Sequence, residues 1–116
     1  MQAVSLNTIM EQPGEIGEIL QRALYHFEHD DLETAGRFCE QIGPRAPERA
    51  DADHLLGLIA NRRGDRRLAV ELIQRAISRD GRRPVWHANL GNLFRILKRY
   101  DEAARALARA LALDSK

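Results

Sequence analysis

Two leucine–glycine pairs, separated by a fixed interval, constrain this chain more than any other feature. Leu56-Gly57 and Leu90-Gly91 stand 34 residues apart. Matching small and bulky residues follow them at the same offsets: Ala60, Ala69, Ile73 and Ala76 after the first pair, Phe94, Ala103, Leu107 and Ala110 after the second, and, one period earlier, His26, Ala35, Cys39 and Ile42. A period of about 20–50 residues is typical of a solenoid of stacked units, none of which buries its apolar face alone. Such chains usually offer binding surfaces.

Helical spacing of apolar residues appears twice within each unit. In the last unit Leu90, Phe94 and Leu97 follow it, and a second series begins at Ala103 after a polar break. We predict Gly64 as a helix C-terminal residue, and Asp65 and Asp101 as N-caps. The pattern predicts six helices, at 15–29, 31–43, 48–63, 66–79, 84–97 and 101–114.

The order of small, aromatic and bulky apolar residues resembles the tetratricopeptide repeat, a two-helix unit of about 34 residues. The resemblance places repeats at 16–49, 50–83 and 84–116, after an N-terminal segment at 1–15. The first repeat departs from the pattern, because Arg22-Ala23 stands in place of Leu-Gly. The resemblance implies an all-α fold, an α-solenoid of three helix-turn-helix repeats with right-handed superhelical stacking.

Composition is consistent with one small domain. The chain has 116 residues, of which 44% are hydrophobic and only 5% aromatic. A single cysteine excludes an internal disulfide framework. The N-terminus lacks the basic flank and apolar run of a signal peptide, and no stretch approaches the ~20 apolar residues of a membrane span. We therefore expect a cytoplasmic protein without a membrane partner.

Charge is divided unevenly along the chain. Residues 1–53 carry four arginines against eleven acidic residues, a net −7, whereas residues 54–116 carry fourteen basic against six acidic residues, a net +8. Stacking turns this difference into an axis that is acidic at the first repeat and basic at the last. Three interpretations stay open: an acidic partner on the later repeats, self-association, and a simply solvated surface.

The densest basic run invites a nucleic-acid hypothesis. It comprises Arg62, Arg63, Arg66 and Arg67. These arginines belong to a turn interrupted by Asp65, and no aromatic residues alternate with them to stack on bases. The overall pI of about 8.0 is also low for a dedicated nucleic-acid domain. We predict no nucleic-acid partner.

No set of residues suggests catalysis or a cofactor. His26 and His29 lie near two aspartates, but an i,i+3 histidine pair is a weak zinc signal, so we expect no metal. Cys39 occupies the slot of Ile73 and Leu107, which predicts a buried, unreactive thiol. The chain lacks a glycine-rich phosphate loop and a serine nucleophile motif. We predict that this chain is not an enzyme.

The tetratricopeptide resemblance implies a concave groove lined by the first helix of each repeat. The candidate groove residues are Leu20, Leu24, Phe27, His54, Leu58, Asn61, Arg62, Asn89, Asn92 and Arg95. They change from apolar in the first repeat to amide and arginine in the last. This surface suits an amphipathic helix or an extended apolar segment of a partner protein. Residues 1–14, with Val4, Leu6, Ile9 and Met10, are an alternative occupant.

A narrower resemblance concerns bacterial enzymes. Residues 50–60 and the run Trp86-His87-Ala88-Asn89-Leu90-Gly91-Asn92 are similar to the repeats of bacterial O-linked N-acetylglucosamine transferase-like proteins, and related repeats precede sulfotransferase domains. There the repeats hold acceptor proteins, and asparagines of the groove bind the acceptor backbone. Asn89 matches that slot, whereas Leu55 and Gln21 fill it in the other repeats. The resemblance implies an alternative function: recruiting acceptors for a larger transferase.

The last predicted helix has no capping helix after it. Stacked repeats need a terminal unit with a polar outer face, and here Leu107 and Leu111 are candidates for an exposed apolar patch. Two expectations follow and stay open. Either the chain forms a homodimer through its C-terminal helices, or it is the front of a longer polypeptide.

Overall fold

A computed structural model describes residues 13–115, which form six helices and no strands. The helices are α2 (Pro13–Glu28), α3 (Leu32–Gln41), α4 (Arg49–Arg62), α5 (Arg66–Arg79), α6 (Pro84–Ile96) and α7 (Tyr100–Asp114). Their bounds agree with the predicted ones to within two residues, except at the start of α7, discussed below, and at its neighbouring connections. The predictions made for residues 1–12 lie outside the described residues.

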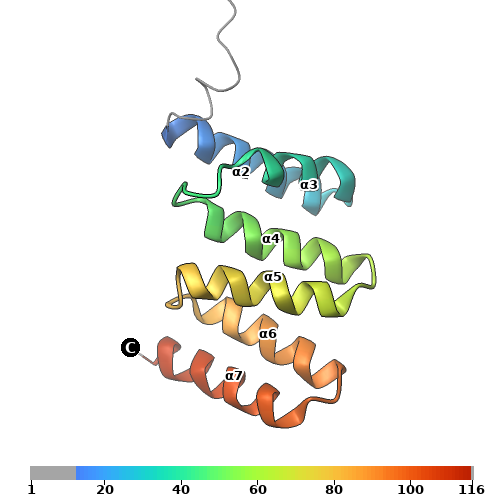
Figure 1. The fold of residues 1–116 in the computed structure, drawn as a ribbon, viewed down its shortest axis with the longest axis vertical. Coiled ribbons are helices and arrows are strands. Elements are labelled where there is room, and N and C mark those ends of the chain that lie inside the picture. The colour runs from blue at the N-terminus through green and yellow to red at the C-terminus, as the bar shows by residue number, and fades with distance from the viewer. Residues whose placement is uncertain (1–12, 116) are drawn as a thin grey trace, which may run out of the picture.

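The helices form three antiparallel pairs stacked along one axis (Figure 1). The first helices of the pairs are α2, α4 and α6, and the second helices are α3, α5 and α7. The tight turns within pairs lie at one end of the helices, here named the turn end, and the connections between pairs lie at the other, the loop end. The predicted all-α solenoid of three helix-turn-helix repeats is confirmed.

The three tight turns share one backbone conformation although their residues differ. Asp30, Gly64 and Lys98 stand 34 residues apart, and all have positive φ, at 64°, 90° and 63°. This left-handed conformation ends one helix and reverses the chain; glycine adopts it at the lowest cost. The prediction for Gly64 is thus confirmed.

The N-caps of the second helices follow the same period, with one exception. Asp31 and Asp65 each accept a hydrogen bond from a backbone N–H three residues ahead, which confirms the prediction for Asp65. The prediction that Asp101 caps the last helix is wrong. Arg99 occupies the cap, and its guanidinium binds Glu102 at 2.7 and 2.9 Å. The period places position 99 in register with Asp65, so the helix starts before Asp101.

Close helix contact within the pairs depends on two glycines. A Cβ atom at Gly57 would lie 2.7 Å from Ile73 Cγ1 and 3.2 Å from the Ala69 carbonyl oxygen. At Gly91 the corresponding distances are 2.7 Å to Leu107 Cγ and 3.3 Å to a carbonyl oxygen. The leucine–glycine frame of the sequence therefore marks where the backbones of paired helices approach.

The core is continuous along the stack. One group of buried residues joins α2, α3 and α4, a second joins α4 to α7, and Leu56 and Leu58 pack against both. Cys39 is completely buried, and burial raises the pKa of its thiol to about 12, as expected for an unreactive packing residue. Within residues 13–115 no helix is both long and apolar enough to cross a membrane.

A buried carboxylate fastens the loop end. Asp53 of α4 is completely buried; Arg49 Nε donates to its Oδ1 at 2.9 Å, and Arg79 Nε lies 3.2 Å from its Oδ2. Oδ2 accepts no hydrogen bond of good geometry, so Arg79 is held there by charge. The same arginines donate to the carbonyl oxygens of Ile42 (2.9 Å) and Pro44 (2.7 Å). Asp53 thereby ties α5 and the α3–α4 connection to α4.

Candidate functional site

The predicted groove residues fall into rows that cross the first helices. Leu24 of α2, Leu58 of α4 and Asn92 of α6 stand one period apart, and so do Phe27, Asn61 and Arg95. Because each row occupies equivalent helix positions, both lie on one side of the stack, here named the groove face. Side chains on this face change from apolar on α2 to polar on α6.

Four of the predicted residues surround one hollow between α4 and α6. Leu58, Asn61, Asn89 and Asn92 line it together with Leu93 and Ile96, and its volume is about 190 Å³. Asn61 Oδ1 is buried and has no hydrogen-bond partner among the described residues. A buried amide oxygen without a donor is costly, by about 1–3 kcal/mol. The hollow thus combines an apolar floor with an unsatisfied acceptor.

His54 holds the Asn89 amide beside this hollow. Asn89 Nδ2 donates to His54 Nε2 at 3.0 Å, so the imidazole is neutral with its proton on Nδ1. The ring stacks on buried Trp86, with centroids 5.0 Å apart, and the guanidinium of Arg83 covers the indole at 4.4 Å. Burial, and then the charge of Arg83, lower the pKa of His54 to about 4. The neutral ring therefore keeps Asn89 oriented at neutral pH.

Arg62 is engaged within the protein. Its guanidinium lies 4.4 Å from the centroid of the Phe27 ring and 3.0 Å from Asp30 Oδ1. These contacts join α4 to α2 across the groove face. Arg62 thus covers Phe27, and part of its charge is already paired.

The remaining predicted residues lie outside the hollow. Leu20 is partly buried against the first core group, and Leu24 is 42% exposed. Arg95 is exposed at the turn end of α6, and among the described residues it forms no ion pair. The structure therefore brings together the α4 and α6 candidates and leaves these others beside them.

The sequence interpretation did not include Leu93 and Ile96 among the lining residues. Ile96 is 45% exposed and stands one period after Arg62, so the 34-residue spacing contained the signal. Leu93 belongs to the buried core and reaches the hollow from below. No comparable signal identified the partners of Arg62, because they depend on side-chain conformations between repeats.

Metal-ligating groups are scattered. Within the described part of the chain no three histidine, cysteine or acidic side chains gather closely enough to hold an ion. His26 instead lies 3.4 Å from Asp31 and stacks on Phe38, and His29 stacks on Tyr25. Larger hollows, of about 470 and 550 Å³, lie along the second helices.

Sequence and structure comparisons agree on the repeat. A family model described as the tetratricopeptide repeat matches residues 84–116. The chain is built of tetratricopeptide repeats. Such repeats are a non-catalytic fold that generally mediates protein–protein interactions.

Three related proteins show how widely this unit occurs. The mouse N-alpha-acetyltransferase 16, NatA auxiliary subunit, is 32% identical over 108 residues, which are 90% of this chain and 12% of that protein. A mutant O-GlcNAc transferase of Thermobaculum terrenum superposes with a TM-score of 0.78 at 27% identity, over 97% of this chain and 20% of that one. MamA superposes at 0.75 with 16% identity, over 92% and 63%. The chain thus spans less than two thirds of the length of each.

Proposed function

We propose that the chain is a protein-interaction module that docks a peptide or helix of a partner protein on the groove face. In this proposal the repeats run over 16–49, 50–83 and 84–116. The observation that carries it is the hollow between α4 and α6. There Asn61, Asn89 and Asn92 offer amide groups to a partner backbone around Leu58. Apolar side chains on α2 extend the same face.

The energetic argument rests on the polar groups of the hollow. A backbone N–H of the partner would satisfy Asn61 Oδ1, once that amide rotates toward the hollow. Asn89 is already fixed by His54, so its binding conformation requires little further loss of side-chain entropy. An extended or helical segment supplies both backbone groups and apolar side chains.

A selection from a random 12-residue peptide phage library tests the proposal. We expect the wild-type protein to enrich peptides that no longer bind Asn92→Trp, which fills the hollow from an exposed position. Leu58→Asp is a second groove variant, and Leu111→Asp, at a 71% exposed position of α7, is the matched control. Circular dichroism confirms that each variant stays helical. Peptides that bind all variants equally would place docking elsewhere, for example on the second helices.

A second function is supported by one specific comparison. The Thermobaculum terrenum O-GlcNAc transferase matches 97% of this chain at 27% identity. We therefore also propose that the repeats recruit acceptor proteins for a larger bacterial glycosyltransferase or sulfotransferase, with Asn89 facing the acceptor backbone. Immunoblotting of source cells is decisive: a band much larger than 13.2 kDa would support this function, and a band of that size would contradict it.

A cytoplasmic location in a bacterium belongs to the same proposal. It is supported by the chain's single cysteine, which cannot form an internal disulfide. Cell fractionation with the same antibody tests it, and recovery from an extracytoplasmic fraction would contradict it.

A further inference from the structure

The groove face changes its chemistry in one direction along the stack. In the row of Leu24, Leu58 and Asn92, the last helix replaces a leucine by an amide. In the row of Phe27, Asn61 and Arg95, it replaces an aromatic ring by a cation. The two ends of the groove therefore favour different parts of a bound segment.

Arg95 is the cation of this face that is open to a ligand. Arg62 lies on Phe27 and pairs with Asp30, whereas Arg95 is exposed and forms no ion pair or aromatic contact within residues 13–115. Lys98, three residues further along the chain, is likewise exposed and unpaired there. A guanidinium beside an amide such as Asn92 is a donor set suited to a carboxylate.

The opposite sign prevails at the α2 end of the groove. Glu28, Asp30 and Asp31 are exposed at the turn end of α2. Arg62 neutralises only part of this charge, through Asp30. An acidic ligand group is repelled there and attracted toward α6. The gradient also disfavours a nucleic-acid strand, whose uniform phosphates would have to cross these carboxylates.

We infer that the groove takes a protein segment with apolar side chains at one end and acidic side chains at the other. The apolar end lies over α2 and α4, at Leu24 and Leu58, and the acidic end lies over α6, at Asn92 and Arg95. This inference rests on the proposed groove function and adds the class of partner and its placement.

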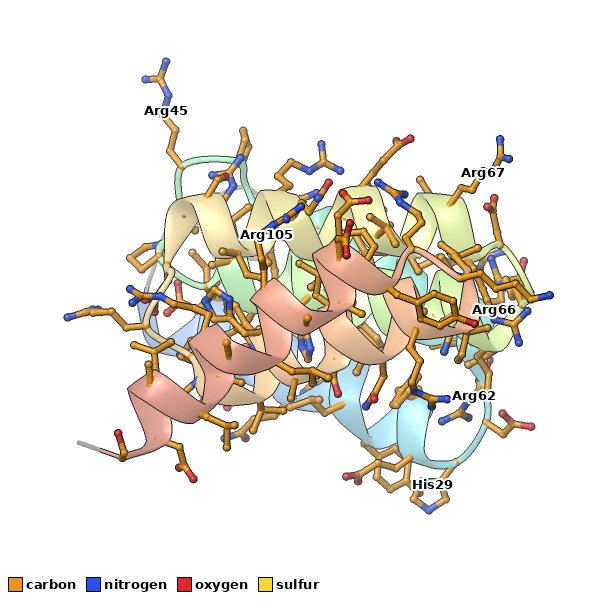
Figure 2. All side chains as sticks on the ribbon, turned by 90° about the horizontal axis from the view of Figure 1, so that it is seen from below. His29, Arg45, Arg62, Arg66, Arg67 and Arg105 are labelled. Carbon is orange, nitrogen blue, oxygen red and sulfur yellow. The ribbon has the colours of Figure 1, made fainter. Side chains whose placement is uncertain are left out.

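The peptides selected on the wild-type protein provide the first test. We expect them to combine apolar residues with acidic residues toward one end. Arg95→Glu should weaken their binding roughly tenfold, the loss expected when a charge-assisted contact becomes a repulsion. Arg105→Glu is the matched control: it makes the same charge change on α7, away from the groove face (Figure 2), and should leave binding unchanged.

Photo-crosslinking tests the placement. A benzophenone group at the apolar end of a selected peptide should label α2 or α4, and one at the acidic end should label α6. Labelling in the reverse sense would overturn the inference. So would groove-dependent peptides that are neutral or basic, although docking on the groove face would then stand. If no peptide depends on Asn92 or Leu58, the proposed function fails first, and this inference fails with it.

Discussion

The two ends of the stack use arginine in opposite ways. At the loop end, Arg49, Arg79 and Arg83 all form ion pairs, two of them with the buried carboxylate of Asp53. At the turn end, Arg63, Arg66 and Arg67 are exposed, and within residues 13–115 they form no ion pair. Figure 2 shows Arg66 and Arg67 extending outward at the turn end.

The difference follows from where the acidic partners lie. Asp53 is removed from water, so its charge must be compensated by nearby cations and hydrogen bonds. The turn-end aspartates, Asp31 and Asp65, are exposed and already accept backbone hydrogen bonds as N-caps. Identical side chains thus hold the stack together at one end and remain available to partners at the other.

The largest expected effect comes from removing the buried carboxylate. Asp53→Ala should lower the free energy of unfolding by about 3–5 kcal/mol, because Arg49 and Arg79 lose their counter-charge. Urea denaturation at pH 7 measures it. Asp51→Ala is the control, since the Asp51–Arg83 pair is partly exposed and contributes about 1 kcal/mol or less. Equal losses from both variants would remove the distinction drawn for Asp53.

Acid should also destabilise the loop end through His54. Its pKa falls from 6.5 in the unfolded chain to about 4 in the fold, so between these values the unfolded chain binds the proton. As pH falls from 6.5 to 4, the free energy of unfolding should drop by at most about 3 kcal/mol. Urea denaturation across this range measures the drop, which should be smaller in His54→Gln. An equal drop in the variant would assign the acid sensitivity to other groups.

Two glycines offer a smaller test of the ends. Gly64→Ala should lower the free energy of unfolding by about 1–2 kcal/mol, because the turn-end position requires a positive φ. Gly43 lies in the α3–α4 connection without a positive φ, and a Cβ there meets open space. Gly43→Ala should therefore change the free energy by no more than about 0.5 kcal/mol. Thermal denaturation of both variants compares them, and similar losses would contradict the strained turn.

The smallest expected effect concerns the exposed arginines. Arg63→Ala, Arg66→Ala and Arg67→Ala should each change the free energy of unfolding by less than about 0.5 kcal/mol. Arg79→Ala, which removes contacts to both Asp53 and Pro44, should cost clearly more. A turn-end variant as destabilising as Arg79→Ala would show that these arginines also support the fold.

The sequence predicted most of the fold because packing repeats with the chain. Gly57 and Gly91 marked close contacts, and helix bounds followed from polar breaks and caps. The buried charge escaped prediction although the same period pointed to it: Ile19, Asp53 and His87 stand 34 residues apart, and all three are buried. A charged residue in an apolar register position was taken for a surface residue.

The groove residues were only partly predictable, for a different reason. Spacing identified the rows on the first helices, including Leu58 and Asn92. It could not show that Arg62 turns onto Phe27 and Asp30, or that His54 fixes Asn89. Those contacts join different repeats and depend on side-chain conformation, which no periodic pattern of one chain records.

The shared conformation of the three turns has a consequence for how such a protein diversifies. Aspartate, glycine and lysine occupy the same backbone geometry at positions 30, 64 and 98, so the stack fixes the path of the chain there whatever side chain it carries. New chemistry can therefore accumulate at that end one residue at a time while the scaffold stays unchanged. Over many generations, a lineage of such proteins can exchange one partner for another without having to invent a new fold.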